Sequence, residues 1–81
     1  MQKFEIKLSL AENVKTFVNI VNKYHFDMDL RAGRHVVDAK SILGIFSLDL
    51  SKPITLEVDD DKNADEAGMA NLLEDIKPFL A

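Results

Sequence analysis

The sequence of 81 residues contains no cysteine. Disulfides, thiolate nucleophiles and the common structural zinc sites are therefore excluded, and a reduced, cytoplasmic location is expected. The sequence also lacks any apolar run approaching the roughly 20 residues that a membrane-spanning helix needs. Its first residues, Met-Gln-Lys-Phe-Glu, alternate charged and apolar side chains, which is not the pattern of a signal peptide.

Positive charge is scarce as well, with 10 lysines and arginines against 14 aspartates and glutamates, for a formal net charge of −4. Phosphate binding needs a basic face, so neither nucleic acid nor a flat anionic membrane is an expected partner. The hydrophobic content of 47% is enough for one modest core. We therefore expect a single domain over residues 1–81, and a monomer whose partners are other proteins.

Motifs for cofactors, metals and catalysis are absent too. Gly33 and Gly44 form no phosphate-binding loop, and no Ser-His-Asp spacing exists. Asp59, Asp60 and Asp61 are consecutive, whereas a calcium loop spaces its ligands around a bend, so these residues predict a solvated turn. We expect no cofactor, no metal site and no enzymatic activity.

Four stretches alternate apolar and polar side chains, which is typical of strands with one buried face. The second and third are joined at Ala32-Gly33, which predicts a hairpin in which Gly33 takes positive φ. The stretches cover residues 2–9, 26–31, 34–38 and 54–59, and their inward positions include Phe4, Ile6, Leu8, Phe26, Met28, Leu30, Ile54, Leu56 and Val58.

Two longer helices are predicted from capping-box spacings followed by apolar residues at helical spacing. The first capping box is Ser9 with Glu12, and the second is Asn63 with Glu66. Pro78 is expected to kink or end the second helix. The predicted inward residues are Val14, Phe17, Val18, Val21 and Tyr24 in the first helix, and Ala67, Ala70, Leu73, Ile76 and Leu80 in the second.

Residues 41–48 predict a third, short helix between the hairpin and the last strand. Ser41 is a strong N-cap candidate, because its hydroxyl can accept from an unpaired N–H of the first turn. The apolar side chains behind it occupy nearly every direction around the helix: Ile42, Leu43, Ile45, Phe46 and Leu48. So small a domain cannot bury all sides, so some of Ile42, Leu43 and Phe46 should lie open as an apolar docking patch.

The predicted order is β-α-β-β-α-β-α, which indicates an α+β fold of two layers. A four-stranded antiparallel sheet would be covered by helices on one face and open to water on the other. The expected wet face carries Asp27, Asp29, Glu57 and Asp59, with Lys3 and Lys7 nearby.

The segment Ala39-Lys-Ser-Ile-Leu-Gly-Ile-Phe-Ser-Leu48 resembles the regulatory-serine region of HPr, the phosphocarrier of the bacterial sugar phosphotransferase system, in its Gram-positive form. The resemblance implies an open-faced β-sandwich of the same element order. It also implies phosphorylation of Ser41 by a dedicated kinase, and partner binding through Lys40, Ile42, Leu43 and Phe46. The implied partners are the serine kinase/phosphatase and a carbon-regulation transcription factor.

The similarity breaks at the family's other functional segment, which is close to Asn-Gly-Leu-His-Thr-Arg-Pro-Ala and carries the phosphoacceptor histidine. Here the first strand passes through Leu8-Ser-Leu-Ala-Glu-Asn-Val14 directly into the first helix. That connection is several residues shorter and contains no histidine, arginine or proline. No residue of this sequence therefore takes the place of the carrier histidine.

Three functional hypotheses follow. The first is a non-enzymatic, HPr-like regulatory adaptor that docks through the short helix and is switched by phosphorylation of Ser41. The second is a phosphocarrier that uses His25 or His35, the two histidines of the chain. The third is a structural partner-binding domain without phosphate chemistry, in which Ser41 is only a cap and both histidines are ordinary surface residues.

Overall fold

The structure is a computed structural model that describes residues 2–59 and 66–81, with the side chain of Glu66 excepted. The elements follow the predicted order, with one 3₁₀ turn added at the C-terminal end. They are β1 (Gln2–Ile6), α1 (Ala11–Val21), β2 (Met28–Ala32), β3 (His35–Asp38), α2 (Ile42–Phe46), β4 (Ile54–Val58), α3 (Glu66–Ile76) and the 3₁₀ helix η1 (Lys77–Phe79). Asp60, Asp61, Asn63 and with them the second predicted capping box lie outside the described residues.

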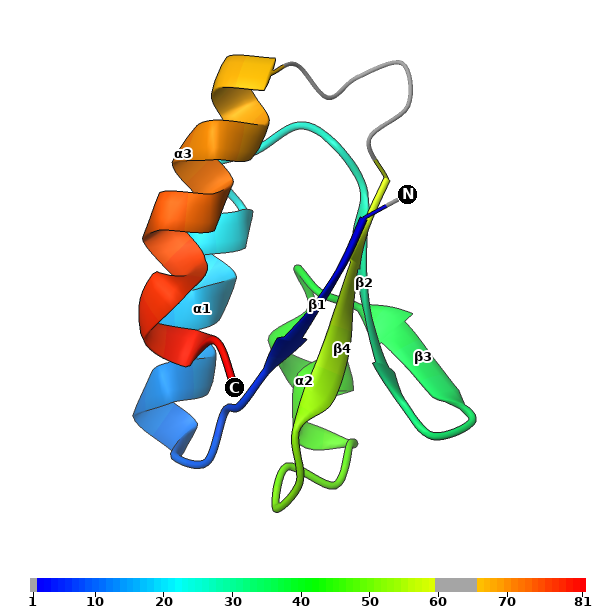
Figure 1. The fold of residues 1–81 in the computed structure, drawn as a ribbon. Coiled ribbons are helices and arrows are strands. Elements are labelled where there is room, and N and C mark those ends of the chain that lie inside the picture. Colours follow the sequence, from blue (N-terminus) through cyan, green and yellow to red (C-terminus); the bar gives the residue numbers. More distant parts are fainter. Residues whose placement is uncertain (1, 60–65) are drawn as a thin grey trace.

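The four strands form one antiparallel sheet in the order β1-β4-β2-β3. All of the helices lie on one face of this sheet, and the other face is open (Figure 1). The predicted α+β fold is therefore confirmed. Gly33 has φ of +61° in the turn between β2 and β3, as the hairpin prediction requires.

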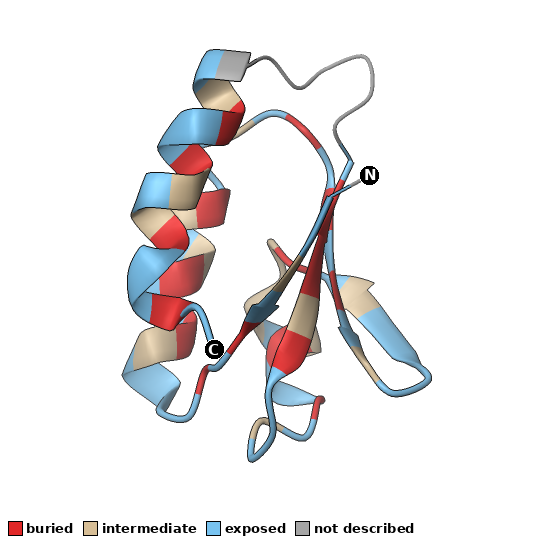
Figure 2. Ribbon diagram, viewed as in Figure 1, coloured by how far each residue is buried: buried red, intermediate tan, exposed pale blue. Residues whose placement is uncertain are grey.

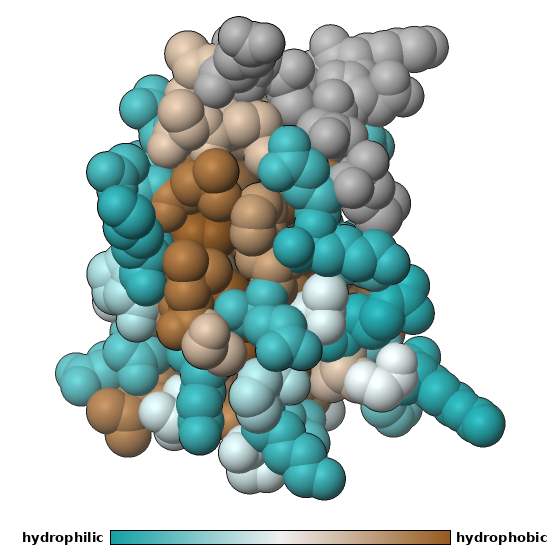
Figure 3. All heavy atoms as spheres, in the orientation of Figure 1, coloured by the Kyte–Doolittle hydropathy of each residue, from teal (hydrophilic) through white to brown (hydrophobic). Residues whose placement is uncertain are grey.

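The core lies between the sheet and the helices, and both layers contribute buried residues to it, drawn in red in Figure 2. Period-2 alternation places the inward residues of the strands there, and helical spacing places Val14, Phe17 and Val21 of α1 there. The Phe17 and Phe79 rings meet edge to face at 5.9 Å between centroids. In Figure 3, hydrophobic side chains also reach the surface between α3 and β1.

The first predicted capping box is wrong. Leu10, with an extended backbone, occupies the N-cap of α1, and no side chain caps the helix. The Leu10 carbonyl accepts from the N–H groups of Asn13 and Val14 at 3.0 and 3.2 Å. The helix begins one residue later than a Ser9 cap would place it, so Ser9 lies just before the N-cap.

The predicted inward face of α3 is partly wrong. Ile76 is buried and Leu73 is half-buried, but Ala67, Ala70 and Leu80 are exposed. The residues that α3 buries instead are Met69 and Leu72, followed by Phe79 of η1. Burying these larger side chains removes more apolar area from water than burying two alanines, and this decides which face docks on the sheet.

Pro78 ends α3 as predicted, since the α-helix stops at Ile76 and Pro78 lies inside η1. The chain then runs beside β1. Phe79 accepts from the Lys7 N–H at 2.7 Å, and Ala81 donates to the Glu5 carbonyl at 3.0 Å. The C-terminal residues therefore cover the β1 edge of the sheet.

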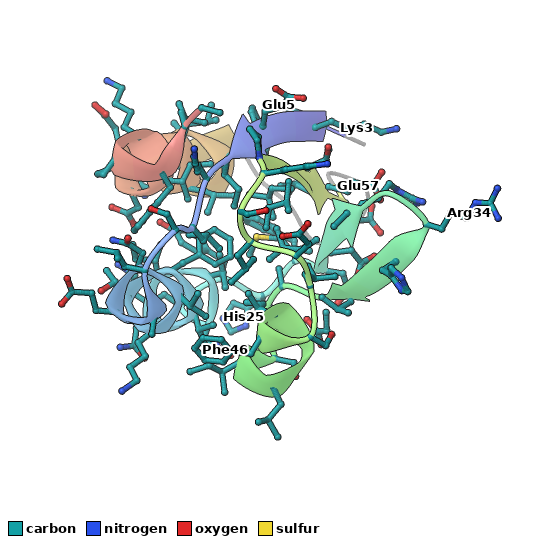
Figure 4. The ribbon with its side chains drawn as sticks, turned by 90° about the horizontal axis from the view of Figure 1, so that it is seen from below. Lys3, Glu5, His25, Arg34, Phe46 and Glu57 are labelled. Carbon is teal, nitrogen blue, oxygen red and sulfur yellow. The ribbon has the colours of Figure 1, made fainter. Side chains whose placement is uncertain are left out.

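Glu57 lies on the predicted open face but is only 5% exposed, contrary to the expectation of a wet side chain. Arg31 donates to it from Nε at 3.1 Å, and the Lys3 ammonium lies 3.5 Å from the same carboxylate oxygen. Figure 4 shows Lys3 and Glu57 close together on neighbouring strands. The hydrogen bond and charge of Arg31 hold the pKa of Glu57 below its ordinary value.

Tyr24, just beyond the end of α1, connects this part of the chain to α3 through a hydrogen bond. Its hydroxyl donates to Asp75 Oδ2 at 2.6 Å, and the Lys23 ammonium lies 3.2 Å from the same oxygen. Burial, followed by the hydrogen bond to Asp75 and the charge of that carboxylate, raises the pKa of Tyr24 to about 12. The protonated phenol is therefore the form that the fold stabilises.

We predict that the only tyrosine of the chain titrates near pH 12, measured by tyrosinate absorbance immediately after a pH jump. An unfolded tyrosine titrates near pH 10, so the contribution of Tyr24 to stability is complete below pH ~10 and is lost as the pH rises through the folded value. Asp75→Asn should move the midpoint back toward the unfolded value. Glu74→Gln, an exposed neighbour on the same helix, should leave it unchanged. Equal midpoints in the two variants would contradict the contact.

Candidate functional site

Ser41 caps α2 as the sequence predicts. It has an extended backbone (φ −103°, ψ 110°), and its Oγ accepts from the Gly44 N–H at 3.2 Å. The chain is turned toward the cap by Asp38, whose carboxylate accepts from the Lys40 N–H at 2.9 Å and whose carbonyl accepts from the Ser41 N–H at 3.0 Å. The hydroxyl is half-buried and held at the first turn of the helix.

Lys40, predicted to bind partners, is used within the fold. Its ammonium donates to the Tyr24 carbonyl at 2.7 Å, just beyond the end of α1. Its own carbonyl accepts from the Asn22 side-chain amide at 3.4 Å. A cation at the C-terminal end of a helix is favourable because the last carbonyls there lack partners. Lys40 thus fixes α2 against the end of α1.

The apolar side chains of α2 are divided between the core and the surface. Ile45 is fully buried, whereas Leu43 is 81% exposed and Phe46 is 45% exposed. Ile42 is partly buried against the core. The geometry agrees with the expectation that so short a helix cannot bury every side. The exposed pair, Leu43 and Phe46, is called the α2 patch below.

Gly44 lies where α2 approaches β3 closely. A Cβ built at this position would lie 3.2 Å from the Val37 Cβ and 3.4 Å from the Ser41 Oγ. The first distance is shorter than ordinary van der Waals contact between carbon atoms, so a side chain here would require Val37 or the helix to shift by a few tenths of an ångström. The glycine therefore lets the helix lie against the strand while its N–H reaches the cap.

The start of α1 is the place where the resemblance would put a phosphoacceptor histidine. Here it presents Leu10, which is 56% exposed, and Glu12 in the first turn. The sequence interpretation missed the exposure of Leu10. The sequence feature that could have revealed it is a leucine directly before the first helical residue, a position where polar capping residues are preferred.

The two histidines lie apart from the start of α1. His25 is exposed beyond the C-terminal end of that helix. His35 is exposed at the start of β3 and lines a shallow cleft of about 280 Å³. The other lining residues are Ala32, Gly33, Asp49, Lys52 and Pro53. Ser51 donates to the Asp49 carboxylate from Oγ at 2.6 Å and from its N–H at 3.0 Å, which lowers the pKa of Asp49.

Within residues 2–59 and 66–81, no three side chains of the metal-binding types lie together. None of the helices in this part of the chain is long and apolar enough to cross a bilayer.

The site thus combines a four-stranded antiparallel sheet with a serine-capped short helix at its side. A family model described as "PTS HPr component phosphorylation site" matches residues 10–77. The chain belongs to the HPr family.

Two solved structures are similar over nearly the whole chain. One is HPr-C-His from Thermoanaerobacter tengcongensis, with 27% identity and a TM-score of 0.71, covering 95% of this chain and 92% of that one. The other is a phosphocarrier protein HPr from Bacillus anthracis, with 26% identity and a TM-score of 0.58, covering 94% of each chain. No curated protein matches the sequence.

We predict that Gly44→Ala will not give the gain of about 1 kcal/mol that replacing glycine by alanine inside a helix usually brings. The added Cβ must push α2 away from Val37, so the free energy of unfolding should stay level or fall. Urea unfolding followed by circular dichroism measures it, with exposed Leu43→Ala as the control on the same helix. A gain of the full helix-propensity value would show that α2 can move away from β3 without cost.

Proposed function

We propose that this protein is an HPr-type regulatory adaptor that binds protein partners through the α2 patch and does not carry phosphate on a histidine. The observation that carries the proposal is the exposure of Leu43 and Phe46 beside the capped Ser41. Exposed apolar side chains that lie together on a small domain are typical of interaction sites. Members of this family interact with other proteins of the phosphotransferase system, which supports a protein as the partner.

The start of α1 supports a role without histidine chemistry. A phosphohistidine would be stabilised at a helix N-terminus, where free N–H groups and the helix dipole favour an anion. At that position the chain has Leu10 and Glu12. A carboxylate in the first turn repels a phosphate, and leucine has no nucleophile to offer.

Phosphorylation of Ser41 is the proposed switch. The free hydroxyl already accepts a hydrogen bond from the first turn of α2, and a phosphate there would add negative charge next to the α2 patch. The ammonium of Lys40 is directed to the Tyr24 carbonyl. The added charge would therefore be met by basic groups of the partner, such as the serine kinase/phosphatase or a carbon-regulation transcription factor.

One observation favours a second candidate function, a phosphocarrier that uses His35. This imidazole shares its cleft with the Lys52 side chain, whose ammonium could offset a phosphate, and with Asp49, whose carboxylate would oppose one. A carrier would lose its phosphate in acid, whereas phosphoserine is stable there.

We predict that incubation with the serine kinase and ATP adds one acid-stable phosphate, detected by intact mass, and that Ser41→Ala abolishes it. Incubation with the general phosphotransferase enzyme and phosphoenolpyruvate should add none. Ser47→Ala, which removes the other serine hydroxyl of this region, is the control and should be phosphorylated normally. A phosphate from phosphoenolpyruvate that is lost in acid and absent in His35→Ala would establish the carrier instead.

We further predict that Leu43→Ser weakens binding of the serine kinase/phosphatase about tenfold, measured by titration calorimetry. Losing a buried leucine contact costs enough free energy for that change. Leu10→Ser is the matched control, because Leu10 is also exposed but lies at the start of α1. Equal affinities for the two variants would remove α2 from the interface, whatever the phosphorylation experiment shows.

A further inference from the structure

The two edges of the sheet are treated differently by the fold. The β1 edge is covered by the C-terminal residues, through the Phe79 and Ala81 hydrogen bonds and the bridge between Ile6 and Leu80. The β3 edge is the end of the sheet, and no other part of the described chain pairs with its outer side. Alternate residues of such a strand direct their N–H and C=O groups outward, where another strand can bind them.

Along this free edge, the apolar residue Val36 lies between the basic Arg34 and the acidic Asp38. Val36 is paired with Arg31 of β2, and Asp38 is paired with Asp29. Arg31 and Asp29 both lie beside Glu57 on the open face of the sheet, so Val36 and Asp38 lie on that face too. Val36 is 43% exposed. Arg34, in the turn just before β3, points away from the rest of the molecule in Figure 4.

An antiparallel pair of β3 strands makes these residues complementary to themselves. If Val36 is paired with Val36 of a second copy, each Arg34 comes level with the Asp38 of that copy. The pair would be related by a two-fold axis normal to the sheet, so the same surface is used twice and the contact closes. Directly opposed residues of antiparallel strands share a face, and opposite charges there are stabilising.

We propose that the β3 edge pairs with the β3 edge of a second copy of this chain, in the register that opposes Val36 to Val36 and Arg34 to Asp38. The result is one continuous sheet across two copies, with the helices of both on the same side. The surface is distinct from the α2 patch and does not depend on the proposed function. At high protein concentration this dimer would form in place of the expected monomer.

The strength of the contact follows from its size. β3 has four residues, so the paired strands bury far less surface than a standard stable interface. Each copy also carries a formal charge of −4, so the overall charges oppose association and only the local pairs favour it. The association should be weak and depend on concentration, with the register set by the two ion pairs.

The test uses charge reversals in two separate preparations, studied by sedimentation equilibrium over a range of protein concentrations. Arg34→Glu alone opposes two acids at each ion pair, and Asp38→Lys alone opposes two bases. Each variant should therefore self-associate about tenfold more weakly than the native chain, since two favourable contacts become unfavourable. An equimolar mixture restores an acid opposite a base at both positions and should associate at least as strongly as the native chain.

Lys15→Glu is the matched control, because Lys15 is exposed on α1 and its reversal changes the net charge by the same amount as Arg34→Glu. It should weaken association much less than Arg34→Glu does, because it changes the net charge without touching the proposed ion pairs. Asp38→Lys also removes the acceptor for the Lys40 N–H, so circular dichroism must first show that the variant folds. If it does not, Asp38→Asn removes the ion pair without reversing it, and this variant by itself should associate more weakly than the native chain. A native chain that stays monomeric, or a mixture no stronger than its components, would overturn the proposal.

The register has an independent test, because the chain contains no cysteine. Opposed residues of antiparallel strands have Cα atoms about 4.5–5.5 Å apart, within the range that a disulfide spans. Val36→Cys should therefore form a disulfide-linked dimer under mild oxidation much faster than Lys15→Cys. Equal rates for the two variants would exclude this pairing.

Discussion

The packing of β4 is the constraint on which the rest of the structure depends. This strand lies between β1 and β2, and its inward side chains Ile54, Leu56 and Val58 are buried against the helices. On its other face Glu57 is buried as well, under the charges of Arg31 and Lys3. A central strand buried on both sides fixes its neighbours, because a slip of one residue would exchange the two faces and leave the carboxylate in the core.

The position of α2 follows from the strand order. β3 is the last strand of the sheet, and α2 packs against β3 and α1. The helix packs closely on Val37 at Gly44, and a hydrogen bond from Lys40 connects it to the end of α1. The apolar residues that remain have no room in the core. The α2 patch is thus a result of placing an apolar helix at the margin of a small domain.

β3 lies at the same margin, and no other part of the described chain pairs with its outer side. Two kinds of surface therefore lie near one another. The α2 patch offers exposed side chains, which suit a protein partner of a different kind. The β3 edge offers backbone groups and a charge pattern that complements itself. By contrast, the start of α1 has an exposed leucine and a carboxylate, which suit neither a phosphate nor a nucleophile.

The sequence by itself determined what depends on neighbours along the chain. The strand alternation, the α1 stripe, the positive φ of Gly33 and the cap at Ser41 are local, because backbone geometry and nearby side chains decide them. Only the tertiary structure decided which face of α3 is buried, since alanines and bulkier residues both repeat at helical spacing and docking selects the larger ones. It also decided the burial of Glu57 and the use of Lys40, because their partners come from distant segments that no sequence period brings together.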